Sequence, residues 1–252
     1  MTKTIAIAGK GGTGKTTIAA LLIQLLAKKG VVLAIDADPS SNLHLALGLP
    51  LTSSVGEVRE EMLTAVKGGK FNPGMAKHDY IDLRVHESLV ESSGIDLLAM
   101  GRPEGPGCYC AANNMLRTTI DRLETNYDFV VIDNEAGMEH ISRQTTRDVD
   151  ILLIISDSSM RGVITAIRTR DLIKELRTHV EKVALVLNRT AGQLSSEVQQ
   201  SIAESGLDLI ATFPVDPMVT DLDGKGTALK ELPENSVMKQ GVETLARKLS
   251  II

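Results

Sequence analysis

The sequence predicts an α/β fold: one doubly wound, mostly parallel sheet with helices on both faces. Apolar, β-branched runs alternate with amphipathic stretches almost from end to end, which is typical of parallel strands joined by helices. The chain has 252 residues, a length at which α/β proteins routinely form a single unit. We therefore expect residues 1–252 to form one domain.

The apolar runs predict six or seven strands, which form a single sheet. They are TIAIAG (4–9), VVLAID (31–36), IDLLAM (95–100), DFVVID (128–133), ILLIIS (151–156), VALVLN (183–188) and LIATFP (209–214). Helices are expected at about 15–29, 113–126, 139–148, 161–179, 194–205 and 235–249. An apolar stripe along the last helix predicts that it packs on the core. The stripe consists of Met238, Val242, Leu245 and Leu249.

Residues 50–95 are less regular than the rest of the chain. They mix charged residues with Gly and Pro, and such stretches break long strands and helices. We expect a helical insertion on the rim of the domain, not a second domain.

Composition argues against several classes of function. The net charge is -5, and the aromatic residues are three Phe, three Tyr and no Trp, so the basic surface and stacking side chains of nucleic-acid binders are missing. No apolar run reaches the roughly 18 residues of a membrane span. The N-terminal apolar stretch is too short for a secretory signal. We expect a cytoplasmic protein that does not bind nucleic acid.

Residues 9–17 read GKGGTGKTT, directly after the first predicted strand and before a predicted helix. This is the context of a phosphate-binding loop, whose glycines let backbone N–H groups approach the anion at a helix N-terminus. Lys15 is expected to reach the β and γ phosphates, and the Thr16 hydroxyl to bind Mg²⁺. The predicted nucleotide-binding residues of the loop are Gly11, Gly12, Thr13, Gly14, Lys15, Thr16 and Thr17.

A second lysine in the loop, Lys10, gives the pattern Lys-Gly-Gly-x-Gly-Lys-Thr-Thr. This resembles the deviant Walker A loop of the family that includes the nitrogenase iron protein, MinD and the ParA partition ATPases. The resemblance extends over nearly the whole chain and implies a single P-loop ATPase domain. In this family the extra lysine crosses a dimer interface, which implies a homodimer in which Lys10 acts on the nucleotide of the partner.

Two further segments match the same family. DADPSSN resembles its Asp-x-Asp-Pro first switch, which implies that Asp38 orients the attacking water and that Asp36 supports it and the metal shell. FVVIDNEAGMEH resembles the Asp-x-x-x-Gly second switch. This implies that Asp133 reaches Mg²⁺ through water and that the Gly137 N–H contacts the γ phosphate.

The sequence also favours adenine over guanine. A GTPase of the general P-loop kind carries Asn-Lys-x-Asp, whereas the matching segment here is LNRTAG, with Ala191 in place of the guanine-reading aspartate. By resemblance to MinD-like ATPases, Asn188 contacts the base together with Pro214 and Asp216 of FPVDP. We therefore expect a Mg²⁺-dependent ATPase.

The two cysteines of the chain, Cys108 and Cys110, lie in GPGCYC. Thiolates suit Ni²⁺ and Zn²⁺, and thiolate-rich tetrahedral sites take four donors. Cysteines two apart in an extended segment point the same way, and a two-fold axis beside them would supply four sulfurs. Two alternatives stay open: a pair of buried inert cysteines, and a redox pair.

Together, the phosphate loop, the second switch and the Cys-x-Cys between them resemble the CooC-type accessory ATPases. These serve nickel insertion into carbon monoxide dehydrogenase, and their relatives serve acetyl-CoA synthase. The resemblance implies a dimerising metallochaperone that hydrolyses ATP, binds Ni²⁺ or Zn²⁺ and delivers it to such a nickel enzyme. The alternative is a MinD- or ParA-like positioning ATPase that acts on membrane or DNA without a metal role.

Overall fold

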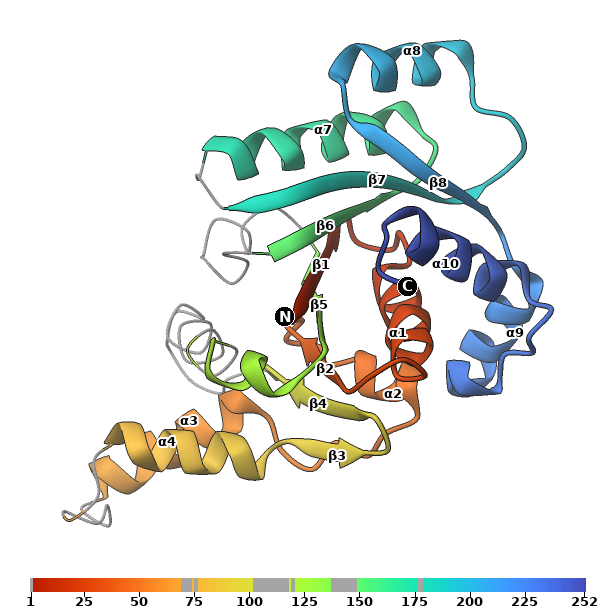
Figure 1. Ribbon diagram of the computed structural model, residues 1–252. Helices are drawn as coiled ribbons and strands as arrows, with labels where there is room; N and C mark the ends of the chain where they lie inside the picture. Colours follow the sequence, from red (N-terminus) through yellow and green to blue (C-terminus); the bar gives the residue numbers. More distant parts are fainter. Residues whose placement is uncertain are drawn as a thin grey trace.

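The chain forms one sheet with helices on both faces (Figure 1), which confirms the predicted fold class. The computed structural model describes residues 2–68, 74, 77–101, 118, 121–136, 149–175 and 179–252. Within these residues the sheet has eight strands in the order β3-β4-β2-β5-β1-β6-β7-β8. Every neighbouring pair is parallel except β3 and β4.

Each predicted strand corresponds to a strand of the sheet, with ends shifted by up to three residues. The strands are β1 (Lys3–Gly9), β2 (Val32–Asp36), β3 (Val90–Ser92), β4 (Ile95–Ala99), β5 (Phe129–Asp133), β6 (Val149–Ser156), β7 (Val180–Thr190) and β8 (Asp208–Pro214). The prediction of six or seven strands was wrong because it omitted the edge strand β3. Its three residues, VES, are too few to show an apolar pattern.

The helices confirm four of the six predictions. The described α-helices are α1 (Lys15–Leu26), α2 (Leu43–Leu47), α3 (Val55–Lys67), α4 (Lys77–Glu87), α7 (Met160–Glu175), α8 (Ser196–Ser205), α9 (Pro217–Lys225) and α10 (Val237–Lys248). Two 3₁₀ turns are η1 (Glu124–Asn126) and η2 (Leu229–Glu231). The helix predicted at 139–148 lies outside the described residues, and so do residues 113–117, 119 and 120 of the helix predicted at 113–126. Two further helices, α2 and α9, were not predicted.

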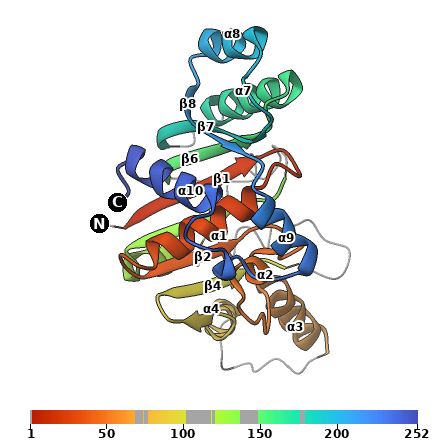
Figure 2. The same ribbon diagram turned by 90° about the vertical axis from the view of Figure 1, so that its right-hand side faces the viewer.

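The core has two halves because successive side chains of a strand point to opposite faces. Ile5 and Ile7 of β1 face the half that contains α1 and α10, whereas Ala6 and Ala8 face the half that contains α7 and α8. Figures 1 and 2 show α1 and α10 on one side of the sheet and α7 on the other. The predicted apolar stripe of α10 is buried in the first half.

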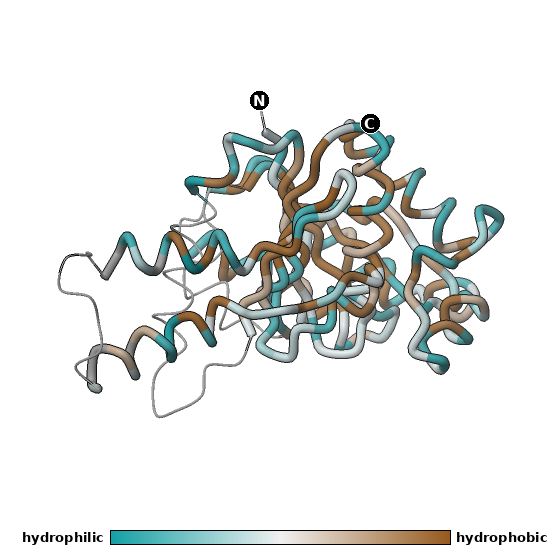
Figure 3. The backbone as a smooth tube through the Cα atoms, turned by 90° about the horizontal axis from the view of Figure 1, so that it is seen from below, coloured by the Kyte–Doolittle hydropathy of each residue, from teal (hydrophilic) through white to brown (hydrophobic). Residues whose placement is uncertain are grey.

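Apolar residues concentrate on the central strands, and polar residues on the outer helices (Figure 3). The helices α3 and α4 lie in the region predicted as a helical insertion and project from the edge of the sheet (Figure 1). Val55, Val58 and Val85 bury the base of this helical pair in the second half of the core. Arg84 of α4 pairs with Glu61 of α3 at 2.7 Å.

The carboxyl ends of the parallel strands share one edge of the sheet. At this edge lie the loop after β1, Asp36 at the end of β2 and Asp133 at the end of β5. Ligands of open α/β sheets bind outside such strand ends. In the described part of the chain, no helix combines the length and the apolar content that crossing a membrane requires.

Candidate nucleotide-binding site

The loop between β1 and α1 leads directly into the N-terminus of α1. Gly14 occupies the position before α1, and no side chain caps the helix there. The first N–H groups of a helix have no partner within it, and together with the helix dipole they attract anions. The Thr13 hydroxyl donates to the Lys10 carbonyl at 2.8 Å and fixes the shape of the loop.

Lys15 lies at the bottom of this loop and is 8% exposed. Its ammonium group is 3.5 Å from the Lys10 carbonyl oxygen. Burial lowers the pKa of Lys15, and attraction to Asp133, Asp38 and Glu135 opposes that shift. The loop therefore holds a buried cation, close to the acidic groups of the two predicted switches.

Asp133 and Thr16 offer oxygen atoms beside Lys15. Asp133 is 1% exposed, and burial raises its pKa to about 6 against the hydrogen bond with Thr16 and the charge of Lys15. Its Oδ1 has no hydrogen-bond partner among the described residues. A buried carboxylate oxygen without a partner, next to a hydroxyl, provides the hard donors that Mg²⁺ prefers. These residues therefore fit the ion.

Asp36 accepts hydrogen bonds from both ends of the first switch segment, at Asp38 and at Leu43. The fully buried carboxylate accepts from the Asp38 N–H at 3.1 Å and from the Leu43 N–H at 2.9 Å. Burial raises the pKa of Asp36 to about 7. Asp38 itself accepts from the Ser40 N–H at 2.8 Å and from the Ser40 hydroxyl at 2.5 Å. Asp36 is thus a positioning residue for the segment that carries Asp38.

The end of β7 is bonded to the phosphate loop. The Asn188 amide donates to the Thr13 carbonyl at 2.9 Å. A Cβ at Gly14 would lie 2.4 Å from the same amide nitrogen, so the close approach requires glycine there. Arg189, which the sequence analysis missed, donates to the Gly12 carbonyl at 3.0 Å. The signal for Arg189 was its place next to a residue already assigned to the base.

A cavity of about 300 Å³ opens beside the loop and brings the predicted base-contacting residues together. It is lined by Thr17, Asn188, Arg189, Pro214, Val215, Asp216, Val219, Thr220, Asp223 and Met238. Asn188, Pro214 and Asp216, the three residues assigned to adenine, all line it. Their contact with adenine stays a prediction.

The Asp216 carboxylate has a structural role that the sequence analysis did not foresee. Its Oδ1 accepts from the Met218 N–H at 2.9 Å and caps α9. Its Oδ2 accepts from the Ser236 hydroxyl at 2.6 Å and from the Met238 N–H at 3.0 Å, at the start of α10. Burial acts to raise the pKa of Asp216, but these hydrogen bonds outweigh it and the pKa is lowered.

Replacing Asp216 with asparagine is expected to lower the free energy of unfolding by about 2–3 kcal/mol at pH 7, because an amide nitrogen cannot accept hydrogen bonds. A lowered native pKa stabilises the fold above the unfolded pKa near 4, and this stabilisation is lost as the pH falls through the native value. The difference in the free energy of unfolding between parent and variant should therefore become smaller toward pH 3. Urea unfolding at both pH values measures it.

Asp221→Asn is the matched control, because the exposed Asp221 side chain pairs only with Lys225 of the same helix among the described contacts. This substitution should change the unfolding free energy by less than about 0.5 kcal/mol. A deficit of Asp216→Asn that is the same at pH 7 and pH 3 would contradict the assigned role of the carboxylate.

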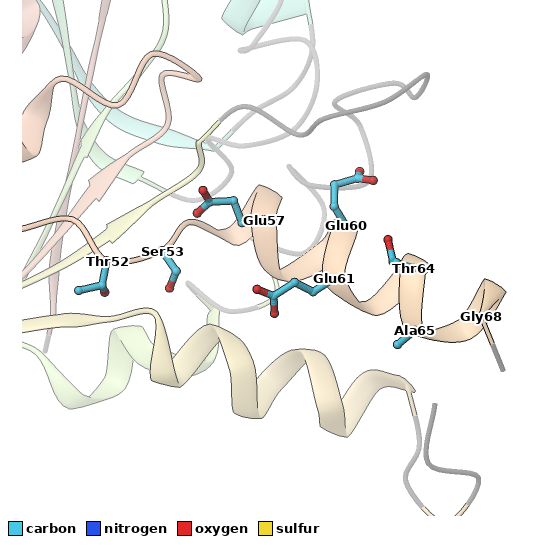
Figure 4. A pocket seen from close by; sticks show the side chains of 8 residues that line it. All are labelled: Thr52, Ser53, Glu57, Glu60, Glu61, Thr64, Ala65 and Gly68. Atoms are coloured by element: carbon cyan, nitrogen blue, oxygen red, sulfur yellow. The ribbon is translucent and has the colours of Figure 1, made fainter. Parts of the chain in front are cut away.

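A larger cavity, of about 770 Å³, lies along α3, away from the loop (Figure 4). Its three acidic side chains are already paired. Glu57 accepts from the Ser54 N–H at 2.7 Å, Glu60 pairs with Arg59 at 2.6 Å and Glu61, which points toward α4, pairs with Arg84. We assign no chemistry to this cavity.

Several predicted site residues fall outside the described part of the chain. These are Gly137 of the second switch and the cysteines Cys108 and Cys110. Within the described residues, no group of three or more His, Cys, Asp or Glu side chains is placed to hold a metal ion.

The chain is similar in sequence to an ATP-binding protein and to an accessory protein of a metalloenzyme. A family model described as an AAA domain matches residues 2–183. An uncharacterized ATP-binding protein of Methanocaldococcus jannaschii is 44% identical over 97% of each chain. The carbon monoxide dehydrogenase accessory protein CooC of Rhodospirillum rubrum is 31% identical over 90% of this chain and 89% of its own.

Among solved structures, the septum site-determining protein MinD of Pyrococcus horikoshii, complexed with Mg-ADP, superposes with a TM-score of 0.70. The likeness covers 99% of this chain and 96% of that one at 20% identity. At this identity it shows the fold alone.

Proposed function

The chain belongs to the AAA domain family of MinD- and ParA-like P-loop ATPases, and from this premise we propose that it is an ATP-hydrolysing homodimeric metallochaperone. Its cargo is Ni²⁺ or Zn²⁺, bound by Cys108 and Cys110 of both subunits. Its client is a nickel enzyme of the carbon monoxide dehydrogenase or acetyl-CoA synthase class. The observation that carries the nucleotide part is the buried Lys15 among Asp133, Asp38 and Glu135, below an uncapped helix.

Each residue around the loop has a distinct task in the proposed reaction. The first N–H groups of α1 and the ammonium of Lys15 hold the phosphates. Thr16 and Asp133 would hold Mg²⁺, which when bound neutralises phosphate charge. Asp38 orients the attacking water, and catalysis by such groups is mainly positioning and electrostatic stabilisation. Asp36 keeps Asp38 in place through the backbone of the switch segment.

The metal part of the proposal is supported by the Cys-x-Cys spacing and by the likeness to the CooC protein. One chain supplies two thiolates, so two chains supply the four that a tetrahedral site takes. A structural zinc site contributes roughly 10–16 kcal/mol, which makes spontaneous release slow. Loss of the γ phosphate would weaken the dimer and halve the ligand set, so that the metal passes to the client.

The double variant Cys108→Ser, Cys110→Ser is expected to lose Ni²⁺ binding and to keep nucleotide binding, because serine lacks the soft thiolate that the site requires. Equilibrium dialysis against Ni²⁺ with a non-hydrolysable ATP analogue should give one ion per parent dimer and none for the variant. His86→Gln, which removes an exposed imidazole, is the control and should bind as the parent does. Equal Ni²⁺ affinity of parent and double variant would refute the metal role.

The alternative function is that of a positioning ATPase of the MinD or ParA kind. The likeness in sequence to the septum site-determining protein MinD of Thermotoga maritima, 26% identical over 97% of this chain, favours it. A net charge of -5 disfavours binding to anionic lipid or DNA. Cosedimentation with anionic vesicles or DNA that requires ATP and is unaffected by the double cysteine variant would replace the metallochaperone proposal.

A further inference from the structure

A further cavity, called the α9 cavity below, adjoins the cavity lined by Asn188, Pro214 and Asp216, which is called the base cavity. It measures about 450 Å³ and lies between the start of α1, the helix α2 and the end of α9. It is lined by Thr16, Thr17, Asn42, Leu45, Ala46, Asp223, Gly226, Thr227 and Leu229. Thr17 and Asp223 line both cavities. These two residues therefore lie where the base cavity and the α9 cavity meet beside the phosphate loop.

The Asp223 side chain has no partner among the described residues. No hydrogen bond or ion pair of its carboxylate is present there, and its backbone carbonyl accepts from the Gly226 N–H as part of the helix end. Its neighbour on the same helix, Asp221, is by contrast paired with Lys225 at 2.7 Å. The exposed carboxylate of Asp223 thus faces the cleft with all its acceptor sites free.

A free carboxylate beside a triphosphate site requires an explanation, because like charges repel. Asp223 does not belong to the acidic set around Lys15, which comprises Asp133, Asp38 and Glu135. The other carboxylate of the base cavity, Asp216, has both oxygens occupied by the polypeptide. Asp223 is therefore the carboxylate of this cleft that is available to a ligand.

The part of ATP between its phosphates and its base is the ribose. With the phosphates on Thr16 and Thr17 and the base in the cavity of Asn188 and Pro214, the ribose lies beside Thr17. Its two hydroxyls are hydrogen-bond donors, and a carboxylate is the side chain that accepts from ribose hydroxyls in other nucleotide sites. Accepting these donors compensates for the repulsion between Asp223 and the phosphates.

The geometry points to Asp223 as the acceptor of the ribose hydroxyls, which makes the site selective for ribonucleotides over deoxyribonucleotides. The inference rests on the proposed nucleotide-binding function and deepens it by naming the sugar that the site selects. Asp223 acts on substrate choice and has no part in orienting the attacking water.

The experiment compares the affinities of ATP and 2′,3′-dideoxy-ATP, in the presence of Mg²⁺, by isothermal titration calorimetry of the full chain. The parent is expected to prefer ATP by about tenfold, the size of a hydrogen bond to a charged group. Asp223→Asn and Asp223→Ala should bind ATP less tightly than the parent does, and their preference for ATP over the dideoxy analogue should fall below about threefold. The control Asp221→Asn should keep the tenfold preference.

The possible outcomes separate this inference from the function on which it rests. A preference for ATP that persists in both Asp223 variants would overturn it. So would an equal change in the affinities of ATP and the dideoxy analogue, because Asp223 would then act on the phosphates. A parent protein that binds no adenine nucleotide would refute the ATPase proposal itself, before any variant is made.

Discussion

Replacing Gly9 with alanine is expected to lower the free energy of unfolding by at least about 4 kcal/mol, a large part of the stability of a typical domain. Gly9 ends β1 and is in register with Ile155 of β6. A Cβ built on Gly9 would lie 2.1 Å from the Ile155 carbonyl oxygen. The clash is with backbone in the centre of the sheet, so β1 and β6 would have to separate to relieve it.

The backbone angle adds to this cost. Gly9 has a φ of 144°, which a residue with a Cβ rarely adopts. Gly206→Ala separates the two contributions, because Gly206 also has a positive φ, 68°, but nothing lies within 4 Å of its Cβ position. That control should lose about 1 kcal/mol. Urea unfolding followed by circular dichroism measures both, and equal losses would show that contact with Ile155 is unimportant.

Local patterns predicted the elements that bury continuous apolar runs. The seven long strands show continuous apolar runs. The helices α1, α7, α8 and α10 show an apolar face, and burial in the two halves of the core explains both patterns. The elements that were missed are short or weakly buried. Strand β3 has three residues and α2 has five, and the described burial of α9 includes Val219 alone.

The parts of the site that carry a sequence motif could be predicted. The parts that the fold brings together from separate elements could not. The residues around Lys15 were named from their order along the chain, and the structure brings the charges of Lys15, Asp38 and Asp133 together. The bonds of Asp216 to the start of α10 and the proposed role of Asp223 depend on how α9 approaches α1 and α10, which no local pattern encodes. A signal did exist for Asp216, since Asp directly before Pro is a common helix start.

Lys10→Ala and Asp38→Ala are each expected to lower the rate of ATP hydrolysis at least about 100-fold while keeping ATP binding. The Lys10 side chain is exposed and makes no hydrogen bond or ion pair within the described residues, and its carbonyl alone contacts the loop. It is therefore free to reach a nucleotide bound to a second subunit. Asp38, by contrast, faces the Lys15 of its own chain.

Because Lys10 serves the nucleotide of the partner and Asp38 serves the nucleotide of its own subunit, the two inactive variants should complement each other in a mixed dimer. In a mixed dimer, the site on the Lys10→Ala subunit has its own Asp38 and receives Lys10 from the Asp38→Ala subunit. Half of the dimers in an equal mixture are mixed, and each contains one complete site of two. The mixture should therefore recover about one quarter of the parent activity, because identical subunits meet through a two-fold interface. A phosphate-release assay at equal total protein measures it.

The control mixture combines Asp38→Ala with Lys15→Ala. Both side chains serve the nucleotide of their own subunit, so every site of a mixed dimer lacks one of them and no activity should return. If ATPase activity returns in the first mixture and not in the control, stabilisation of one variant by the other does not explain the recovery. If the first mixture stays as inactive as its parts, although cross-linking shows mixed dimers, then Lys10 acts within its own chain and the shared site is disproved.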